Sequence, residues 1–194
     1  MNYYYITSKY SLIPKILFNK YNYTEAFKKT FDIGTGERIG TASLAEHKAE
    51  IIYALPGSLR CDFGEQGPEE EEQDRIYPLI CKLLETAGSV QKYNKVVFSF
   101  CPSVQRENEI PEKPALHLVI QEGDNLLLAN SYPAAHFNTA LYFLFLAVKR
   151  VQFNPEQTCV RVCGSLSREE KETLEKYFRG VEIFALERIG SLCK

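Results

Sequence analysis

Residues 115–132, with the sequence ALHLVIQEGDNLLLANSY, decide the fold of this chain. Apolar and β-branched residues dominate Ala115–Gln121 and Leu126–Tyr132, and the turn signal Glu-Gly-Asp-Asn at 122–125 separates them. This pattern predicts two antiparallel strands joined by a tight turn. The apolar stretch Lys95–Phe100 comes before them and predicts a third strand. We therefore expect an antiparallel meander of these three strands.

After the meander, helices and strands alternate. The apolar segment Phe137–Phe153 predicts a long helix, which Asn154-Pro155 ends. Ser167 and Glu170 have the spacing of a capping box, at the start of a helix that runs to Phe178. A helix between consecutive strands implies a parallel right-handed crossover. We predict an α/β unit over residues 94–194 with helices packed on a mixed sheet, completed by two further strands, Cys159–Cys163 and Val181–Leu186.

Residues 1–93 are predicted to form a separate N-terminal lobe. Pro78 lies where helical spacing of apolar residues begins, so it either begins the fully bonded helix or kinks it. The acidic run at 69–74 is interpreted as a solvated helix start. The predicted elements are, in order, a strand over 2–6, a short helix begun by Pro14, a helix capped by Thr24, a strand over 49–55, and a helix from the acidic run to Gly88.

Charge and composition exclude several classes of function. A net charge of −2 with scattered lysines and arginines argues against a nucleic-acid-binding groove. The longest apolar run, Ala140–Val148, is too short to span a bilayer. The six cysteines contain no Cys-x-x-Cys pair, so we expect free thiols in a reducing compartment. We therefore predict a cytoplasmic protein with no membrane span and no nucleic-acid partner.

The element order of residues 94–194 is the one found in each half of ribonuclease-H-like and actin-like proteins. A closer likeness lies in six segments: Leu126–Tyr132, Phe143-Leu144, Phe153–Glu156, the strand ending in Gly164, Tyr177–Val181 and, more loosely, Leu12–Phe18. In these segments the sequence resembles a Bacteroidetes family of unknown function whose members have an actin-like ATPase fold. That resemblance implies two related lobes around a cleft. Compared with the family pattern the chain begins late, so we expect either an incomplete N-terminal lobe or a misassigned start.

One candidate site is the segment Asp32-Ile33-Gly34-Thr35-Gly36, which looks like the phosphate-binding turn of actin-like kinases and ATPases. In those proteins an Asp assists the metal and the Gly-Thr backbone cradles phosphate. The motif needs a strand before and after it, but residues 26–30 predict a helix. The return over residues 37–43 has only Ile39 as a clear apolar residue. A glycine turn that ends a helix is therefore the preferred interpretation of Asp32, Gly34 and Thr35.

Other candidate sites are weaker. Gly164 and Ser165 lie at a strand-to-helix junction, where actin-like proteins approach the adenosine, although an ordinary connection needs the same residues. The equivalent of the phosphate turn in the second lobe would follow Phe100, and Cys101–Val104 contains neither Asp nor Gly. A ribonuclease-H nuclease is excluded because Lys95–Phe100 and Cys159–Cys163 contain no carboxylates to hold metal ions. The histidines, His47, His117 and His136, are interpreted as structural.

Two hypotheses follow. The favoured one is a non-catalytic protein-binding or scaffold module on an actin-like fold, with an unknown protein partner and no cofactor. The alternative is an actin-like nucleotide-binding protein or ATPase that uses ATP and Mg at Asp32, Gly34, Thr35, Gly164 and Ser165. Tyrosines can anchor a protein interface, and the first half is rich in them: Tyr3, Tyr4, Tyr5, Tyr10, Tyr21 and Tyr23.

Overall fold

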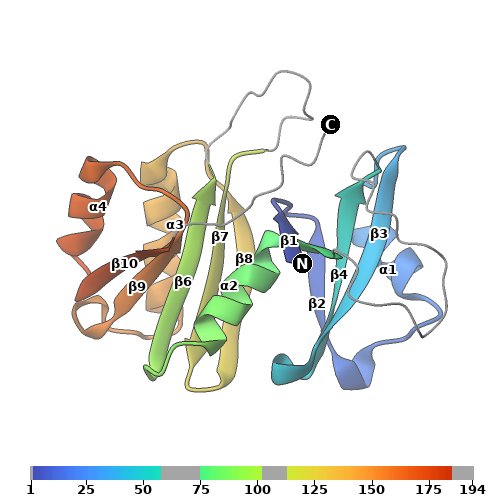
Figure 1. Cartoon of the computed structure of the whole chain (residues 1–194), viewed down its shortest axis with the longest axis horizontal. Coiled ribbons are helices and arrows are strands. Elements are labelled where there is room, and N and C mark those ends of the chain that lie inside the picture. The colour runs from blue at the N-terminus through green and yellow to red at the C-terminus, as the bar shows by residue number, and fades with distance from the viewer. Residues whose placement is uncertain (1, 58–74, 102–112, 185–194) are drawn as a thin grey trace. The chain divides into compact units, whose positions relative to one another are not determined.

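The computed structural model describes residues 2–57, 75–101 and 113–184 (Figure 1). They form two compact units, which divide between Pro78 and Leu79. This division lies earlier than the boundary predicted between residues 93 and 94. Helix α2 (Leu79–Gly88) accounts for the difference, because it packs on strands β6 (Asn94–Cys101) and β7 (Ala115–Glu122) of the second unit.

The second unit is built on a five-stranded mixed sheet with the order β10-β9-β6-β7-β8. Strands β6, β7 and β8 (Asn125–Pro133) pair antiparallel, as the meander predicted. Strand β9 (Cys159–Cys163) pairs parallel with both β6 and β10 (Gly180–Phe184). The predicted order of strands and crossovers in this half is therefore confirmed, although Leu186, the predicted end of the last strand, lies outside the described residues.

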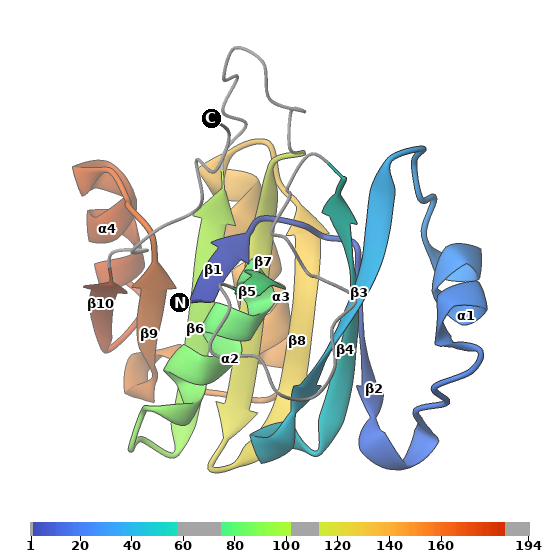
Figure 2. The same cartoon turned by 45° about the vertical axis from the view of Figure 1, so that its right-hand side comes forward.

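Helices cover both faces of this sheet (Figure 2). Helix α3 (Phe137–Arg150) lies on β7 and β8, where Leu144 packs in a core with Leu116 and Leu118. It ends three residues before the predicted Phe153, because the φ angle of Gln152 is 60° and the Phe153 N–H donates to the Val148 carbonyl at 3.1 Å. This is the closure of a Schellman motif. The short 3₁₀ helix η3 (Pro155–Gln157) follows it.

Helix α4 (Arg168–Glu175) begins with the predicted capping box. The Ser167 hydroxyl accepts from the Glu170 N–H at 3.2 Å, and the Glu170 carboxylate accepts from the Ser167 N–H at 2.7 Å. Two of the helix's otherwise unpaired N–H groups are thereby satisfied. The helix packs against β10 and is three residues shorter than predicted.

The first unit contains two small sheets. Strands β1 (Asn2–Tyr5) and β5 (Arg75–Pro78) pair parallel. Strands β2 (Tyr10–Pro14) and β3 (Glu37–Leu44) each pair antiparallel with the central strand β4 (Ala49–Pro56). The sheet of β2, β3 and β4 is covered by helix α1 (Tyr23–Thr30), with Phe27, Ile52 and Ala54 at the centre of the core. Two 3₁₀ turns complete it, η1 (Lys15–Leu17) and η2 (Ala45–His47).

Three predictions for this unit need correction. The N-cap of α1 is Asn22, so Thr24 lies inside the helix. Arg75–Pro78 is a strand, and Pro78 ends it, so the helix begins at Leu79. Residues 37–44 do form a returning strand, β3. The acidic run at 69–74 lies outside the described residues.

Candidate functional site

The turn around Asp32 connects a helix to a strand. Helix α1 ends where the Phe31 N–H donates to the Phe27 carbonyl at 2.9 Å, and Phe31 itself is extended. The Phe31 ring lies 4.8 Å from that of Phe27, which fixes the exit of the chain from the helix. The Glu37 N–H then closes the turn on the Gly34 carbonyl at 3.1 Å. A helix therefore precedes the motif, as expected for a glycine turn that ends a helix. A strand follows the motif, as a phosphate-binding turn would require.

Glycine is required at two places beside this turn. Gly36 has a φ of +98°, which lies in the region that L side chains rarely adopt. A Cβ atom on Gly57, at the end of β4, would come within 2.1 Å of the Gly36 carbonyl oxygen. The backbone of the turn therefore lies against the backbone that leaves β4.

A carboxylate of the chain itself occupies the turn. The Oε2 atom of Glu37 accepts from the Gly34 N–H at 2.6 Å and from the Lys9 ammonium at 2.7 Å. Lys9 also donates to the Asp32 carbonyl at 2.6 Å, so it joins the β1–β2 connection to the turn. Charge-assisted hydrogen bonds of this kind are stronger than neutral ones. The N–H that phosphate would need is thus already paired with an anion.

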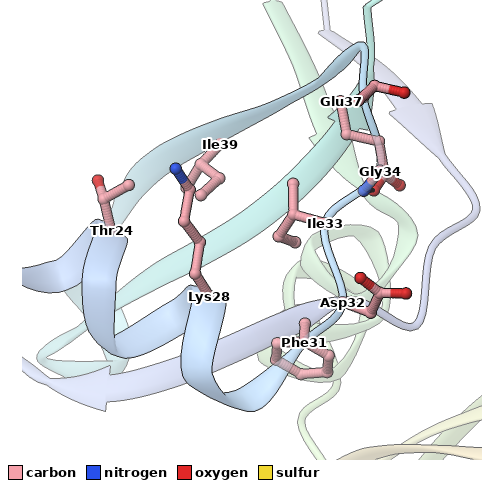
Figure 3. Close-up of a pocket in the computed structure, with 9 residues that line it drawn as sticks. Thr24, Lys28, Phe31, Asp32, Ile33, Gly34, Glu37 and Ile39 are labelled. Carbon is pink, nitrogen blue, oxygen red and sulfur yellow. Dashed lines mark hydrogen bonds between the residues drawn. The ribbon is translucent and has the colours of Figure 1, made fainter.

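The turn lines a pocket of about 580 Å³ in the first unit. Figure 3 shows Thr24 and Lys28 of α1 at one end, Asp32, Gly34 and Glu37 at the other, and Ile33 between them. Apolar side chains of Phe31, Ile33 and Ile39 complete the lining, together with Thr35. The structure therefore brings three of the residues proposed from sequence, Asp32, Gly34 and Thr35, to one pocket.

Sequence reasoning missed the polar partners of this pocket. Thr24, Lys28 and Asp32 follow one another at intervals of four residues, which places Thr24 and Lys28 on one helix face above the turn. That spacing could have indicated Thr24 and Lys28. No sequence spacing indicates Lys9, because it lies in another segment and contacts Glu37 only in the folded unit.

The arrangement does not fit a magnesium nucleotide. A phosphate site of this type needs free backbone N–H groups, and a magnesium site needs oxygen ligands that converge. The Gly34 N–H is bound to Glu37, and the Asp32 side chain is exposed to solvent. In the ranges that the structure describes, no group of three His, Cys, Asp or Glu side chains is placed to hold a metal ion.

Gly164 and Ser165 lie in the second unit, at the junction between β9 and α4. Gly164 has a φ of +127°, and its N–H donates to the Phe184 carbonyl at 2.8 Å. This bond ties the end of β9 to β10, which gives Gly164 a structural role in the connection. Of the predicted turn after Phe100, Cys101 ends β6 and residues 102–104 lie outside the described residues.

Comparison with known proteins gives the family. The model of a family described as "Protein of unknown function (DUF3822)" matches residues 3–181. The chain belongs to this family. A solved structure from Bacteroides thetaiotaomicron VPI-5482, a protein with actin-like ATPase fold and unknown function, superposes with a TM-score of 0.69 at 23% sequence identity. The superposition covers 94% of the present chain and 67% of that chain. No curated protein gives a significant match.

These comparisons confirm the resemblance and the α/β, actin-like fold inferred from sequence. They leave the activity open, since one actin-like scaffold can carry different functions. None of the helices in the described part of the chain is both long and apolar enough to cross a membrane.

His117 is a buried histidine whose pKa is shifted by its surroundings. Its side chain is fully buried, its Nδ1 atom lies 2.6 Å from the Ser131 hydroxyl, and burial lowers its pKa to about 4. Its Nε2 atom has no hydrogen-bond partner among the described residues. A serine hydrogen-bonded to a histidine is one arrangement that activates a nucleophile, but the catalytic groups must then be able to reach the substrate. His117 is completely buried, which favours the structural role predicted for it.

The buried cysteines are poor nucleophiles. Burial raises the pKa of Cys81 to about 12, and it also raises the pKa of Cys163, whose thiol lies 3.8 Å from the Thr86 hydroxyl. Since the thiolate is the reactive form, neither thiol is prepared for catalysis at neutral pH.

The outer surface of α3 and α4 carries exposed aromatic and aliphatic side chains. Tyr142 and Leu146 lie one helical turn apart on α3 and are 61% and 47% exposed, and Tyr177, just after α4, is 51% exposed. The two tyrosines are in contact with other rings: Tyr142 contacts Phe143 edge-on at 5.4 Å, and Tyr177 contacts Phe145 edge-on at 5.1 Å. We call Tyr142, Leu146 and Tyr177 the α3 stripe.

Proposed function

We propose that the protein is a non-catalytic protein-binding or scaffold module on an actin-like fold. The α3 stripe is the observation that carries this proposal. Helix α3 is apolar around most of its circumference: Leu144 and Val148 face the sheet, while Tyr142 and Leu146 face solvent. A helix with apolar residues on its outer side as well is typical of one that another element covers.

The stripe also has the character of an interface hot spot. Tyrosines contribute a large contact area, lose few rotamers on binding and are enriched at interface centres. Tyr142 and Tyr177 are already restrained by ring contacts with Phe143 and Phe145, so a partner would order them at little entropic cost. The preferred occupant is therefore another protein with an apolar groove.

Site-specific crosslinking in cells tests this proposal. A benzophenone amino acid at Tyr142 should give one discrete protein adduct on irradiation, and Leu146→Lys in the same chain should abolish that adduct. The matched control carries the benzophenone at Glu172, an exposed position on α4. Adducts that are identical at both positions, or no adduct at Tyr142, would contradict a partner on the stripe.

The alternative is an actin-like nucleotide-binding protein or ATPase. One observation favours it: Asp32, Gly34 and Thr35 line the same pocket as Lys28, a cation that could meet phosphate. The Glu37 carboxylate opposes it, since nucleotide would first have to displace that group from the Gly34 N–H. ATP binding in the pocket would need this rearrangement, whereas partner binding on the α3 stripe needs none.

A thermal unfolding titration with Mg-ATP separates the two functions. Any ligand that binds the folded state alone raises the apparent stability by an amount set by its concentration and Kd. The proposed function predicts no shift at millimolar Mg-ATP for the wild type. A shift that Asp32→Asn removes would instead support the nucleotide-binding alternative.

A further inference from the structure

The connection between β2 and α1 exposes large apolar side chains almost completely. Ile16 is 92% exposed, Leu17 72% and Tyr21 95%. Residues 15–21, here called the tip, include η1 and lie beside η2 at one end of the sheet of β2, β3 and β4 (Figure 1). Side chains this exposed stand out from the surface and do not line a recess.

The base of the tip is anchored. The Lys15 N–H donates to the Lys48 carbonyl at 2.8 Å, which ties η1 to the turn after η2. Phe18 packs against the core of the first unit, and its ring lies 5.5 Å from that of Tyr23. The Tyr21 N–H donates to the Asn19 side-chain oxygen at 2.9 Å. The backbone that carries the exposed side chains is therefore held in place by these hydrogen bonds and by the packing of Phe18.

The charge around the tip is positive although the chain as a whole carries −2. Lys15 and Lys20 lie within the tip, and Lys48 lies beside it; all three are exposed. Glu46, in η2, is the acidic residue of the adjoining turn. Cationic side chains next to projecting apolar ones match an anionic lipid surface, where lysines contact headgroups and apolar groups enter the acyl boundary.

We infer that the tip is a membrane-docking element, which inserts Ile16 and Leu17 into the interface of an anionic lipid bilayer. Lys15, Lys20 and Lys48 bind the headgroup phosphates. Tyr21 lies at the headgroup level, where tyrosine is enriched because one end of its ring is apolar and the other polar. The protein attaches to the surface without spanning it. This activity goes beyond the proposed protein-binding function and rests on a different unit of the chain.

Vesicle flotation measures the binding. Wild-type protein should float with vesicles of equal parts phosphatidylglycerol and phosphatidylcholine and stay behind with phosphatidylcholine alone. Replacing both apolar residues, Ile16→Ser with Leu17→Ser, should weaken partition at least about tenfold. Lys15→Gln and Lys20→Gln should each weaken it about fivefold and reduce its sensitivity to salt. Tyr142→Ser, on the other unit, is the matched control and should leave partition unchanged.

A fluorophore at the tip reports insertion directly, because the natural sequence contains no tryptophan. Leu17→Trp should show a blue shift with anionic vesicles and quenching by brominated acyl chains, whereas Tyr142→Trp should show neither. Failure of the wild type to bind anionic vesicles would overturn the inference and leave the tip to an acidic protein partner. Partition that survives Ile16→Ser with Leu17→Ser would also overturn it.

Discussion

Lowering the pH should destabilise the protein through His117. This side chain is fully buried, and burial lowers its pKa from 6.5 to about 4. In the unfolded chain it titrates near 6.5, so between these values the unfolded state binds more protons and stability rises with pH. The stability is fully present above about pH 6.5 and is lost as the pH falls toward 4. The total effect is about 3 kcal/mol, of which about 2 kcal/mol is lost between about pH 7.5 and about pH 5.

Urea unfolding at both pH values, followed by circular dichroism, measures this effect. Carboxylates also titrate over part of this range, so the comparison is made with His117→Asn, whose amide can still meet the Ser131 hydroxyl where Nδ1 now lies. The variant should be less stable at neutral pH but should lose about 2 kcal/mol less on acidification. His136→Asn, at an exposed position before α3, controls for the loss of a histidine as such. If wild type and His117→Asn lose the same stability on acidification, the reasoning is wrong.

Three further outcomes can be checked by urea unfolding at neutral pH. Glu37→Ala should lower the free energy of unfolding by about 1–2 kcal/mol, because the Gly34 N–H and Lys9 lose a charge-assisted partner. Glu37→Gln should lower it by about half as much, since the amide oxygen still accepts from the Gly34 N–H. Equal losses for the two variants would contradict this reasoning. Ser167→Ala should cost about 1 kcal/mol through loss of the capping box, and Ser167→Asp should restore most of it. Leu144→Ala should cost about 2–5 kcal/mol because the side chain is 1% exposed in the core, and a cost below 1 kcal/mol would place it outside the core.

Sequence reasoning succeeded where a pattern was long and local. The second unit has apolar strands of five to nine residues, a strong turn signal at 122–125, and the Ser167–Glu170 box, so its order could be predicted. It failed in the first unit where tertiary contacts decide the structure. Strand β3 has few apolar residues because it lies at the sheet edge, and a Cβ at Gly40 would lie only 3.0 Å from the Tyr53 ring. Strand β5 has only four residues and ends in a proline, so no periodicity marks it.

The candidate site was predictable only in part, for the same reason. Asp32, Gly34 and Thr35 belong to one short motif, and that motif is read directly from the chain. Glu37, whose carboxylate accepts from the Gly34 N–H, follows three residues after Gly34, but its second partner, Lys9, comes from a distant segment. Such a contact between distant segments cannot be read from spacing. The pairing of Lys9 with Glu37 is therefore visible only in the folded unit.

The parallel pair of β1 and β5 has a consequence for synthesis on the ribosome. Asn2–Tyr5 pairs with Arg75–Pro78, whereas β2, β3 and β4 find their partners within a shorter stretch. At about 5–20 residues per second, the first strand waits on the order of several seconds for its partner to be made. During that interval the side chain of Tyr4, which is 6% exposed in the folded protein, stays exposed to solvent. The segment Asn2–Tyr5 is therefore one that a ribosome-associated chaperone has reason to hold until β5 is made.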